Sequence, residues 1–195
     1  MNNPKISILI PTKNRPQMLK RAIEYITIQD YDNWEALIVD DSNEINEEIL
    51  KLLLDNPKIK YIIGKKEGIT YAMNWMIGNF ASGDLFVWHN DDDYLPQGIF
   101  KYVVENIGNN EWCYGNIQLV NENKESVGLM GDGNYDYEKL KLGNFIPQPS
   151  VYWTKYALEK VGIFDNTYEH SSDYEYWLRL GRMLMTKRPG VIISE

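Results

Sequence analysis

The stretch Leu85-Phe86-Val87-Trp88-His89-Asn90-Asp91-Asp92-Asp93 passes directly from an apolar run to three consecutive carboxylates. A short, continuous apolar run is typical of a strand that is buried on both faces, as in a parallel sheet. Three adjacent carboxylates repel one another, so we expect a cation to compensate them, and oxygen ligands suit magnesium or manganese. In an extended chain, Asp91 and Asp93 project to the same side and can share one ion. The alternative is a solvated acidic loop at the positive end of the next helix.

Polar loops also follow two other predicted strands, Lys5–Ile10 and Trp34–Val39. These loops read Pro11-Thr12-Lys13-Asn14-Arg15 and Asp40-Asp41-Ser42. Because ligands of parallel sheets bind beyond the carboxyl ends of the strands, we expect the three loops to converge on one site. An aspartate after the second strand suits a hydrogen bond from a nucleobase N–H or a ribose hydroxyl. The alternative is a pair of turn acids that cap the next helix.

A repeated strand and helix pattern fills the first half of the chain. Apolar residues at helical spacing follow the strands over residues 16–29, 45–53, 70–81 and 97–107, and a third strand is predicted at 60–63. This alternation predicts an α/β fold with a Rossmann-like, doubly wound, mostly parallel sheet. The second half is predicted to be smaller and mixed or antiparallel. It has an antiparallel pair at 112–120 and 126–130, a strand at 151–153, helices from Lys155 and Ser172, and a last strand at 191–194.

The composition narrows the class of protein. The 195 residues contain 28 Asp+Glu against 20 Lys+Arg, a net charge of −8, which argues against a nucleic-acid partner. The single cysteine, Cys113, excludes a disulfide framework. We find no apolar run of membrane-spanning length and no signal-peptide pattern, so we expect a cytoplasmic protein, with peripheral membrane association as an alternative. The chain has 14 Tyr and 6 Trp against 5 Phe, which suits either a polar ligand that needs a flat surface or ordinary core packing.

Ser172-Asp173-Tyr174-Glu175 has the form of a capping box, with Asp173 in the first turn of the helix. A carboxylate held there can act as the general base that deprotonates an attacking hydroxyl. The alternative is an acid that only compensates the helix dipole. His89 and His170 lie just before Asp91 and Asp173, where each can line the site or be structural.

Taken in order, these motifs resemble family 2 of the glycosyltransferases, the nucleotide-diphospho-sugar transferases of the GT-A fold. Residues 6–15 (ISILIPTKNR) resemble its opening strand and loop, 37–42 (LIVDDS) its second strand end, and 68–74 (GITYAMN) its third helix. Residues 81–93 resemble its metal-binding DxD element. Residues 149–151, 161–165 and 173–180 resemble its later motifs, so the resemblance extends over nearly the whole chain.

The resemblance implies an inverting, metal-dependent glycosyltransferase that uses Mn²⁺ or Mg²⁺. The donor is expected to be a UDP-sugar, and the acceptor a saccharide or lipid-linked saccharide. It implies one domain over residues 1–195, with a nucleotide-binding half (1–108) and an acceptor-side half (109–195). The resemblance implies metal binding by Asp91 and Asp93 and base catalysis by Asp173. Lys66 is expected to supply a further positive charge to the nucleotide. The expected nucleotide-binding residues are therefore Pro11, Thr12, Asn14, Arg15, Asp41, Lys66 and Asp92.

Two departures from the family pattern limit these assignments. Ser172 replaces the usual glutamate before the catalytic aspartate. One residue fewer than expected separates the triplet from Pro96, which leaves open which two of the three aspartates bind metal. The expectation remains that six acids face one cleft: Asp40, Asp41, Asp91, Asp92, Asp93 and Asp173. Tyr135, Tyr137, Trp153 and Trp177 are candidates for an aromatic sugar platform, and for Trp177 packing of the last helix is the favoured interpretation.

Two other functions compete with this hypothesis. A sugar-phosphate nucleotidyltransferase shares the strand and helix pattern but needs a glycine-rich loop after the first strand, and Pro11–Arg15 contains no glycine. A non-catalytic or truncated nucleotide-sugar-binding module is suggested by the end of the chain at Glu195. Binding without transfer would distinguish that module from an enzyme.

Overall fold

The computed structural model describes residues 3–44, 47–54, 56–121, 123, 125–131, 134–168, 170–184 and 186–187. The strands are β1 (Ile6–Thr12), β2 (Trp34–Asp40), β3 (Ile59–Ile63), β4 (Leu85–Trp88), β5 (Trp112–Cys113), β6 (Ile117–Val120), β7 (Ser126–Met130), β8 (Tyr152–Thr154) and β9 (Thr186–Lys187). The helices are α1 (Pro16–Thr27), α2 (Glu47–Leu54), α3 (Ile69–Asn79), α4 (Ile99–Ile107), α5 (Tyr137–Leu140), α6 (Lys155–Val161) and α7 (Ser172–Met183), with a 3₁₀ turn at Gln148–Ser150.

A seven-stranded sheet in the order β3-β2-β1-β4-β8-β5-β9 forms the centre of the molecule. The pairs among β3, β2, β1 and β4 are parallel, whereas β8 runs antiparallel to both β4 and β5. The predicted doubly wound, mostly parallel sheet with a mixed second part is therefore confirmed. All seven residues of β1 are buried, as expected for a strand covered on both faces.

The second half differs from the prediction in one strand. Residues 112–120 were expected to form one strand, but the chain leaves the main sheet after β5 and forms a separate antiparallel ribbon with β6 and β7. A side chain at Gly131, after β7, would approach the Gly115 carbonyl oxygen to 2.8 Å, so glycine permits this close return. The strand predicted at 191–194 lies outside the described residues.

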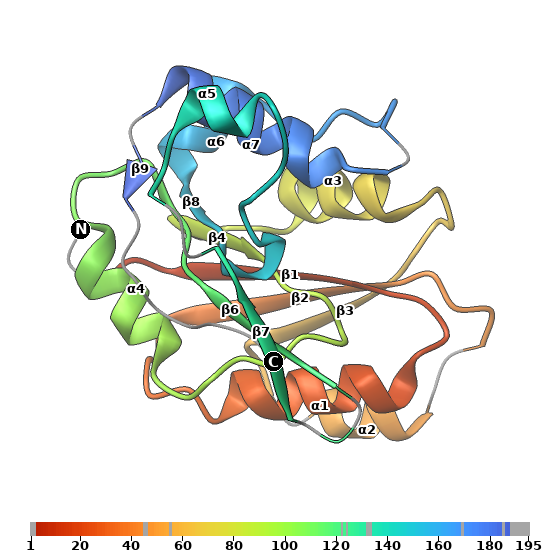
Figure 1. The fold of residues 1–195 in the computed structure, drawn as a ribbon. Helices are drawn as coiled ribbons and strands as arrows, with labels where there is room; N and C mark the ends of the chain where they lie inside the picture. Colours follow the sequence, from red (N-terminus) through yellow and green to blue (C-terminus); the bar gives the residue numbers. More distant parts are fainter. Residues whose placement is uncertain are drawn as a thin grey trace.

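Helices cover both faces of the sheet, and the two faces have different cores (Figure 1). Helices α1, α2 and α4 pack a mainly aliphatic core on one face. Helices α3, α5, α6 and α7 pack the other face, where the buried aromatic rings include Phe86, Trp88, Trp112, Tyr114, Trp153, Phe164, Tyr176 and Trp177. Trp153 and Trp177 are fully buried. The expected place of Trp153 in a sugar platform is therefore wrong, whereas the core packing favoured for Trp177 is confirmed.

The starts of α1 and α7 both follow residues with a left-handed backbone. Helix α1 begins at Pro16, its cap position is Arg15, and Asn14 has φ 57°. Helix α7 begins at Ser172 itself and not after it, so the capping box is wrong; Ser171 precedes the helix with φ 60° and makes no side-chain cap. Among the described residues, none of the helices is long and apolar enough to cross a membrane.

Candidate functional site

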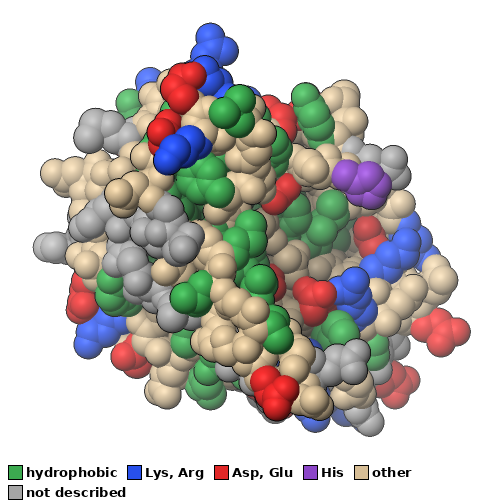
Figure 2. All heavy atoms as spheres, viewed as in Figure 1, with side chains coloured by type: hydrophobic (Ala, Val, Ile, Leu, Met, Phe, Trp, Pro, Cys, Tyr) green, Lys and Arg blue, Asp and Glu red, His purple; other side chains and the backbone are tan. Residues whose placement is uncertain are grey.

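A pocket of about 1200 Å³ lies beyond the carboxyl ends of β1, β2 and β4, where the three polar loops were expected to converge. The face in Figure 2 is hollowed, and acidic and basic side chains lie side by side in the hollow. The lining residues are Pro11, Thr12, Lys13, Arg15, Asp41, Lys66, Glu67, Gly68, Ile69, Thr70, Tyr71, Asn90, Asp91, Asp92, Asn166, Thr167 and Tyr168. The convergence is therefore confirmed for all three loops.

Most of the predicted site residues share this pocket, but not all of them do. Asn14 lines a smaller neighbouring pocket of about 410 Å³, together with Asp40. Asp93 and Asp173 line neither of these two pockets. The expectation that six acids face one cleft is therefore wrong: Asp41, Asp91 and Asp92 face the large pocket.

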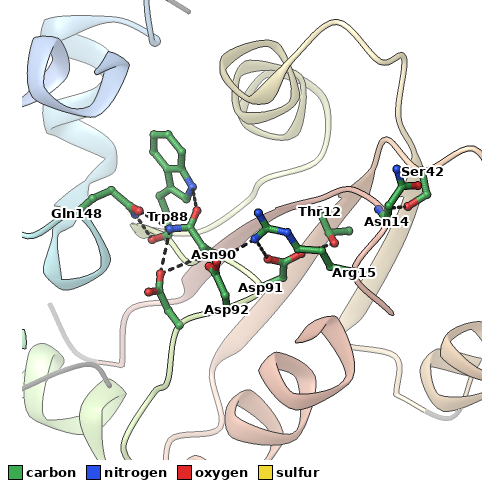
Figure 3. A network of polar contacts seen from close by, with 10 residues as sticks. Thr12, Asn14, Arg15, Ser42, Trp88, Asn90, Asp91, Asp92 and Gln148 are labelled. Atoms are coloured by element: carbon green, nitrogen blue, oxygen red, sulfur yellow. Dashed lines mark hydrogen bonds and ion pairs between the residues drawn. The ribbon is translucent and has the colours of Figure 1, made fainter. Parts of the chain in front are cut away.

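Arg15, Thr12, Asp91 and Asp92 form one side of the pocket, which we call the charged wall (Figure 3). The Arg15 guanidinium lies 3.1 Å from Asp91 Oδ1 and 2.8 Å from Asp92 Oδ2, and the Thr12 hydroxyl donates to Asp91 Oδ2 at 2.6 Å. Asp91 raises the pKa of Arg15 above its usual value. In this structure the cation that compensates these carboxylates is thus a side chain of the same protein. Sequence reasoning missed the pair because its members lie 76 positions apart.

The three consecutive aspartates lie on a turn. The expectation that Asp91 and Asp93 share one ion assumed an extended chain, and that assumption is wrong. The Asp93 N–H donates to the Asn90 carbonyl at 3.3 Å, and Asp93 Oδ2 accepts from the Asn90 side chain at 3.0 Å. Asn90 also donates to Gln148 Oε1 at 2.6 Å, and Gln148 donates to the Trp88 carbonyl at 2.6 Å. Figure 3 shows Gln148 and Asn90 on the side of the turn away from Arg15. The turn therefore separates the Asp93 side chain from the charged wall.

Burial shifts the pKa values of titratable groups around the turn. Burial, with a contribution from Asp92, raises the pKa of Asp93 to about 7. Burial also raises the pKa of Asp91, although Thr12 and Arg15 partly oppose this. His89 is fully buried, its ring nitrogens have no hydrogen-bond partner among the described residues, and burial lowers its pKa to about 3. His89 is thus a neutral side chain inside the fold and does not line the pocket.

Asp41 follows β2 and accepts a hydrogen bond from the backbone N–H of Lys66 at 2.8 Å through Oδ1. A side chain at Gly64 would come within 1.9 Å of that oxygen, so the close approach of the two loops needs glycine. Lys66 has a left-handed backbone with φ 61°, an uncommon conformation for a residue with a side chain. This strained junction fixes Asp41 and Lys66 at the rim of the pocket.

The opposite side of the pocket consists of Thr70, Tyr71, Asn166, Thr167 and Tyr168, which we call the neutral wall. Thr70 and Tyr71 come from the first turn of α3, and the other three residues come from the segment before α7. The Thr70 hydroxyl lies 3.4 Å from the Tyr168 carbonyl oxygen, which joins the two parts. Sequence reasoning did not identify these residues, because they carry no charge and become neighbours only in the fold.

Asp173 lies in the first turn of α7, as predicted, with a half-buried side chain. Its carboxylate has no hydrogen-bond or ion-pair partner among the described residues. The geometry thus presents a free carboxylate on the helix that follows the neutral wall.

The charged wall also offers ligands for a metal ion. The described residues contain no group of three or more His, Cys, Asp or Glu arranged to hold a metal ion. However, Asp91 and Asp92 carry two negative charges against the single charge of Arg15, and their donor atoms are oxygens, which suit a hard divalent cation. The donor set therefore fits Mg²⁺ or Mn²⁺ once Arg15 is displaced from the carboxylates.

Comparison with known proteins confirms the resemblance and the GT-A fold. The model of the family described as glycosyl transferase family 2 matches residues 7–167. The chain is 25% identical over 183 residues to the UDP-Glc:alpha-D-GlcNAc-diphosphoundecaprenol beta-1,3-glucosyltransferase WfgD of Escherichia coli, covering 92% of this chain and 71% of WfgD. It spans 60% of the length of two uncharacterized Rickettsia glycosyltransferases that are 27% identical to it over 93% of this chain.

Solved structures share the fold at lower identity. Staphylococcus aureus TarS, solved with UDP-GlcNAc, has a TM-score of 0.78 at 13% identity, over 97% of this chain and 57% of that one. The mannosyltransferase PcManGT of Pyrobaculum calidifontis, solved with GDP-Man and Mn²⁺, has a TM-score of 0.68 at 14% identity, over 100% of this chain and 57% of that one.

Proposed function

Because the chain belongs to glycosyl transferase family 2, we propose that it binds a nucleotide-diphospho-sugar in the large pocket and transfers the sugar to an acceptor hydroxyl. The observation that carries this proposal is the pocket itself, which places the charged wall opposite the neutral wall at the carboxyl ends of the parallel strands. A diphosphate needs compensation of its charge, whereas a sugar needs neutral hydrogen-bonding groups and a ring to pack on. The two walls supply these two environments.

We propose that the nucleotide lies along the ends of β1 and β2. Pro11, Thr12, Asn14 and Arg15 would hold it on one side. Asp41 and Lys66 would hold it on the other, where the second carboxylate oxygen of Asp41 is an acceptor for a base N–H or a ribose hydroxyl. WfgD and TarS use or bind UDP-sugars and PcManGT binds GDP-Man, so a UDP-linked donor is the first choice and a GDP-linked donor the second.

We propose that a divalent cation is held by Asp91 and Asp92, the two carboxylates that face the pocket. Asp91 and Asp92 would hold this ion, which would supply positive charge to the diphosphate leaving group. The sequence favoured Asp91 with Asp93, but Asp93 lies against Asn90, which supports the pair on the charged wall. The Arg15 guanidinium, freed from the carboxylates, is then available to the anionic oxygens of the diphosphate.

Asp173 is the proposed catalytic base. It accepts the proton of the acceptor hydroxyl while the hydroxyl oxygen forms a bond to the anomeric carbon. The bond from that carbon to the diphosphate oxygen breaks on the opposite side, and the nucleoside diphosphate leaves with the electron pair. This single displacement inverts the anomeric centre. Correct positioning of a base contributes roughly 10²–10⁴-fold to the rate.

The acceptor is proposed to be a saccharide or a lipid-linked saccharide, because WfgD acts on a diphosphoundecaprenol-linked sugar. We propose that the residues form one domain, in which residues 1–108 bind the nucleotide and contribute Thr70 and Tyr71 to the neutral wall, and residues 109–195 contribute the rest of that wall and, on the acceptor side, Asp173. The sheet supports a single domain, since β8 from the second part pairs directly with β4 from the first.

The test is turnover of UDP-glucose, UDP-GlcNAc and GDP-mannose in the presence of Mn²⁺, with a panel of free and lipid-linked saccharide acceptors. We expect transfer from at least one UDP-sugar with inversion at the anomeric carbon. Binding without transfer to any acceptor would support the non-catalytic module instead. Retention of configuration would contradict the role of Asp173 as the base of a single displacement.

A further inference from the structure

Asn74, in the middle of α3, is joined to the segment before α7 by three hydrogen bonds. Its Nδ2 donates to the Phe164 carbonyl at 2.8 Å and to Asn166 Oδ1 at 2.9 Å, and its Oδ1 accepts from the Phe164 N–H at 2.9 Å. The two bonds to Phe164 use both of its backbone polar groups, as a neighbouring strand would. The Asn74 side chain thus provides the hydrogen bonds that a backbone partner would give to Phe164, which lies 90 positions away in the sequence.

The contact uses both polar atoms of the Asn74 side chain. An asparagine amide has two N–H donors and one carbonyl acceptor, and both donors and the acceptor are occupied here. Asn74 is only 9% exposed, and Phe164 is also buried, so water cannot easily replace these bonds. No other residue type of this size offers donor and acceptor in the same arrangement.

The segment that Asn74 holds supplies most of the neutral wall. Asn166, Thr167 and Tyr168 line the pocket directly after Phe164. One helical turn before Asn74, Thr70 contacts the Tyr168 carbonyl oxygen, so one face of α3 contacts both ends of the segment. The same segment leads into α7, which carries Asp173.

We propose that Asn74 is a positioning residue that fixes the neutral wall for recognition of the donor sugar. It touches neither pocket nor substrate and acts through Asn166 and Tyr168, whose amide and aromatic ring suit the hydroxyls and flat face of a hexose. The charged wall and the nucleotide residues make no hydrogen bond to Asn74. Loss of Asn74 should therefore weaken binding of the sugar but not of the nucleotide. The ligand in this proposal, a donor sugar, rests on the proposed function. The role of Asn74 in holding the segment before α7 does not depend on that function.

The experiment compares Asn74→Ala and the isosteric Asn74→Asp with Asn79→Ala, an exposed asparagine on the same helix, as the matched control. Amide hydrogen exchange reports on residues 164–168 directly, without a ligand. Calorimetry with Mn²⁺ then gives the affinities for UDP, UDP-glucose and UDP-GlcNAc. Asn74→Asp keeps an acceptor for the Phe164 N–H and loses both donors, so it tests the contact if the alanine variant does not fold.

We expect faster exchange at Phe164, Thr167 and Tyr168 in Asn74→Ala, faster exchange at Thr167 and Tyr168 in Asn74→Asp, which keeps the acceptor of the Phe164 N–H, and no change in Asn79→Ala. We also expect at least a tenfold loss of affinity for the UDP-sugar that wild type binds, with UDP within twofold of wild type. Unchanged exchange, or an equal loss for UDP and UDP-sugar, would overturn the proposal. A wild-type protein that binds neither UDP nor the UDP-sugars would contradict the proposed function instead, while the exchange rates would still decide whether Asn74 fixes the segment.

Discussion

The two walls of the pocket are built in different ways. The charged wall consists of side chains at the ends of β1 and β4, and ion pairs hold it together. The neutral wall consists of uncharged side chains from α3 and the segment before α7, and hydrogen bonds from Thr70 and Asn74 hold it in place. The first wall suits an anion or a metal ion, and the second suits a sugar. The following variants test this difference between the two walls and the roles proposed for Asp173 and Asp93.

The largest effect is expected from Asp173→Asn, which removes the proposed base beside the neutral wall. The turnover number should fall roughly 10²–10⁴-fold, because an amide cannot take the proton of the acceptor hydroxyl as the proposed Asp173 carboxylate does. Affinity for the UDP-sugar, measured by calorimetry, should stay within threefold of wild type. The control is Glu159→Gln on exposed α6, which should keep full turnover. Full activity of Asp173→Asn would remove Asp173 from the mechanism.

The next prediction distinguishes the role of Asp91 from that of Asp93. Asp91→Asn should weaken the Mn²⁺-dependent affinity for UDP at least tenfold, about 1.4 kcal/mol, because it takes a charged ligand from the charged wall. Asp93→Asn should change that affinity less than threefold, because Asp93 lies against Asn90 outside the pocket. The reverse order would restore the assignment of Asp93 as a metal ligand.

A smaller effect is expected on the free energy of unfolding of the metal-free protein, and it arises from Asp93 alone. Its pKa is about 7 in the folded protein and near 4 when unfolded, so wild-type stability should fall as pH rises from about 4 to 7. Asp93→Asn removes this loss of stability at higher pH and keeps an acceptor for the Asn90 side chain. Urea unfolding in EDTA at pH 8 should show the variant more stable by about 1–2 kcal/mol, a value reduced by the partial exposure of the side chain. The advantage should vanish below pH 4; an equal difference at all pH values would contradict this account.

The smallest effect is expected from Tyr168→Ala, a change at an exposed ring of the neutral wall. Loss of ring packing should reduce affinity for the UDP-sugar by about 0.5–1.5 kcal/mol and leave affinity for UDP unchanged. Tyr156→Ala, an exposed tyrosine on α6 that lines neither pocket, is the matched control. Loss of UDP affinity in Tyr168→Ala would mean that the two walls do not divide the donor as proposed.

The charged wall was largely predictable from the sequence, and the neutral wall was not. Strand periodicity located β1, β2 and β4, and the topology of parallel sheets brought Arg15, Asp41 and Asp91 to one edge. The pairing of Arg15 with Asp91 and the turn that removes Asp93 from the wall depend on side-chain contacts between distant positions. Asn74 ends the family motif over residues 68–74, but that motif did not indicate its contacts, and Tyr168 carries no local signal, because both roles arise only when α3 meets the segment before α7.

The places of the aromatic rings also could not be predicted from the sequence. A surplus of Tyr and Trp was consistent with either a sugar platform or the core, and composition cannot distinguish them. Trp153 lies between Phe86 and Phe164 in the fold, with ring centroids 6.0 Å from each, and has no exposed surface. The rings that do face the pocket are Tyr71 and Tyr168, which no periodicity marks.

The central claim is that the charged wall binds the diphosphate of a nucleotide sugar through a divalent cation. The most direct measurement is calorimetric titration of UDP-glucose and UDP-GlcNAc into the protein, once with Mn²⁺ and once with EDTA. The account predicts binding of at least one UDP-sugar with Mn²⁺ and at least tenfold weaker binding in EDTA, because an acidic protein must bring a cation to an anionic donor. Equal affinity with and without the metal would contradict it.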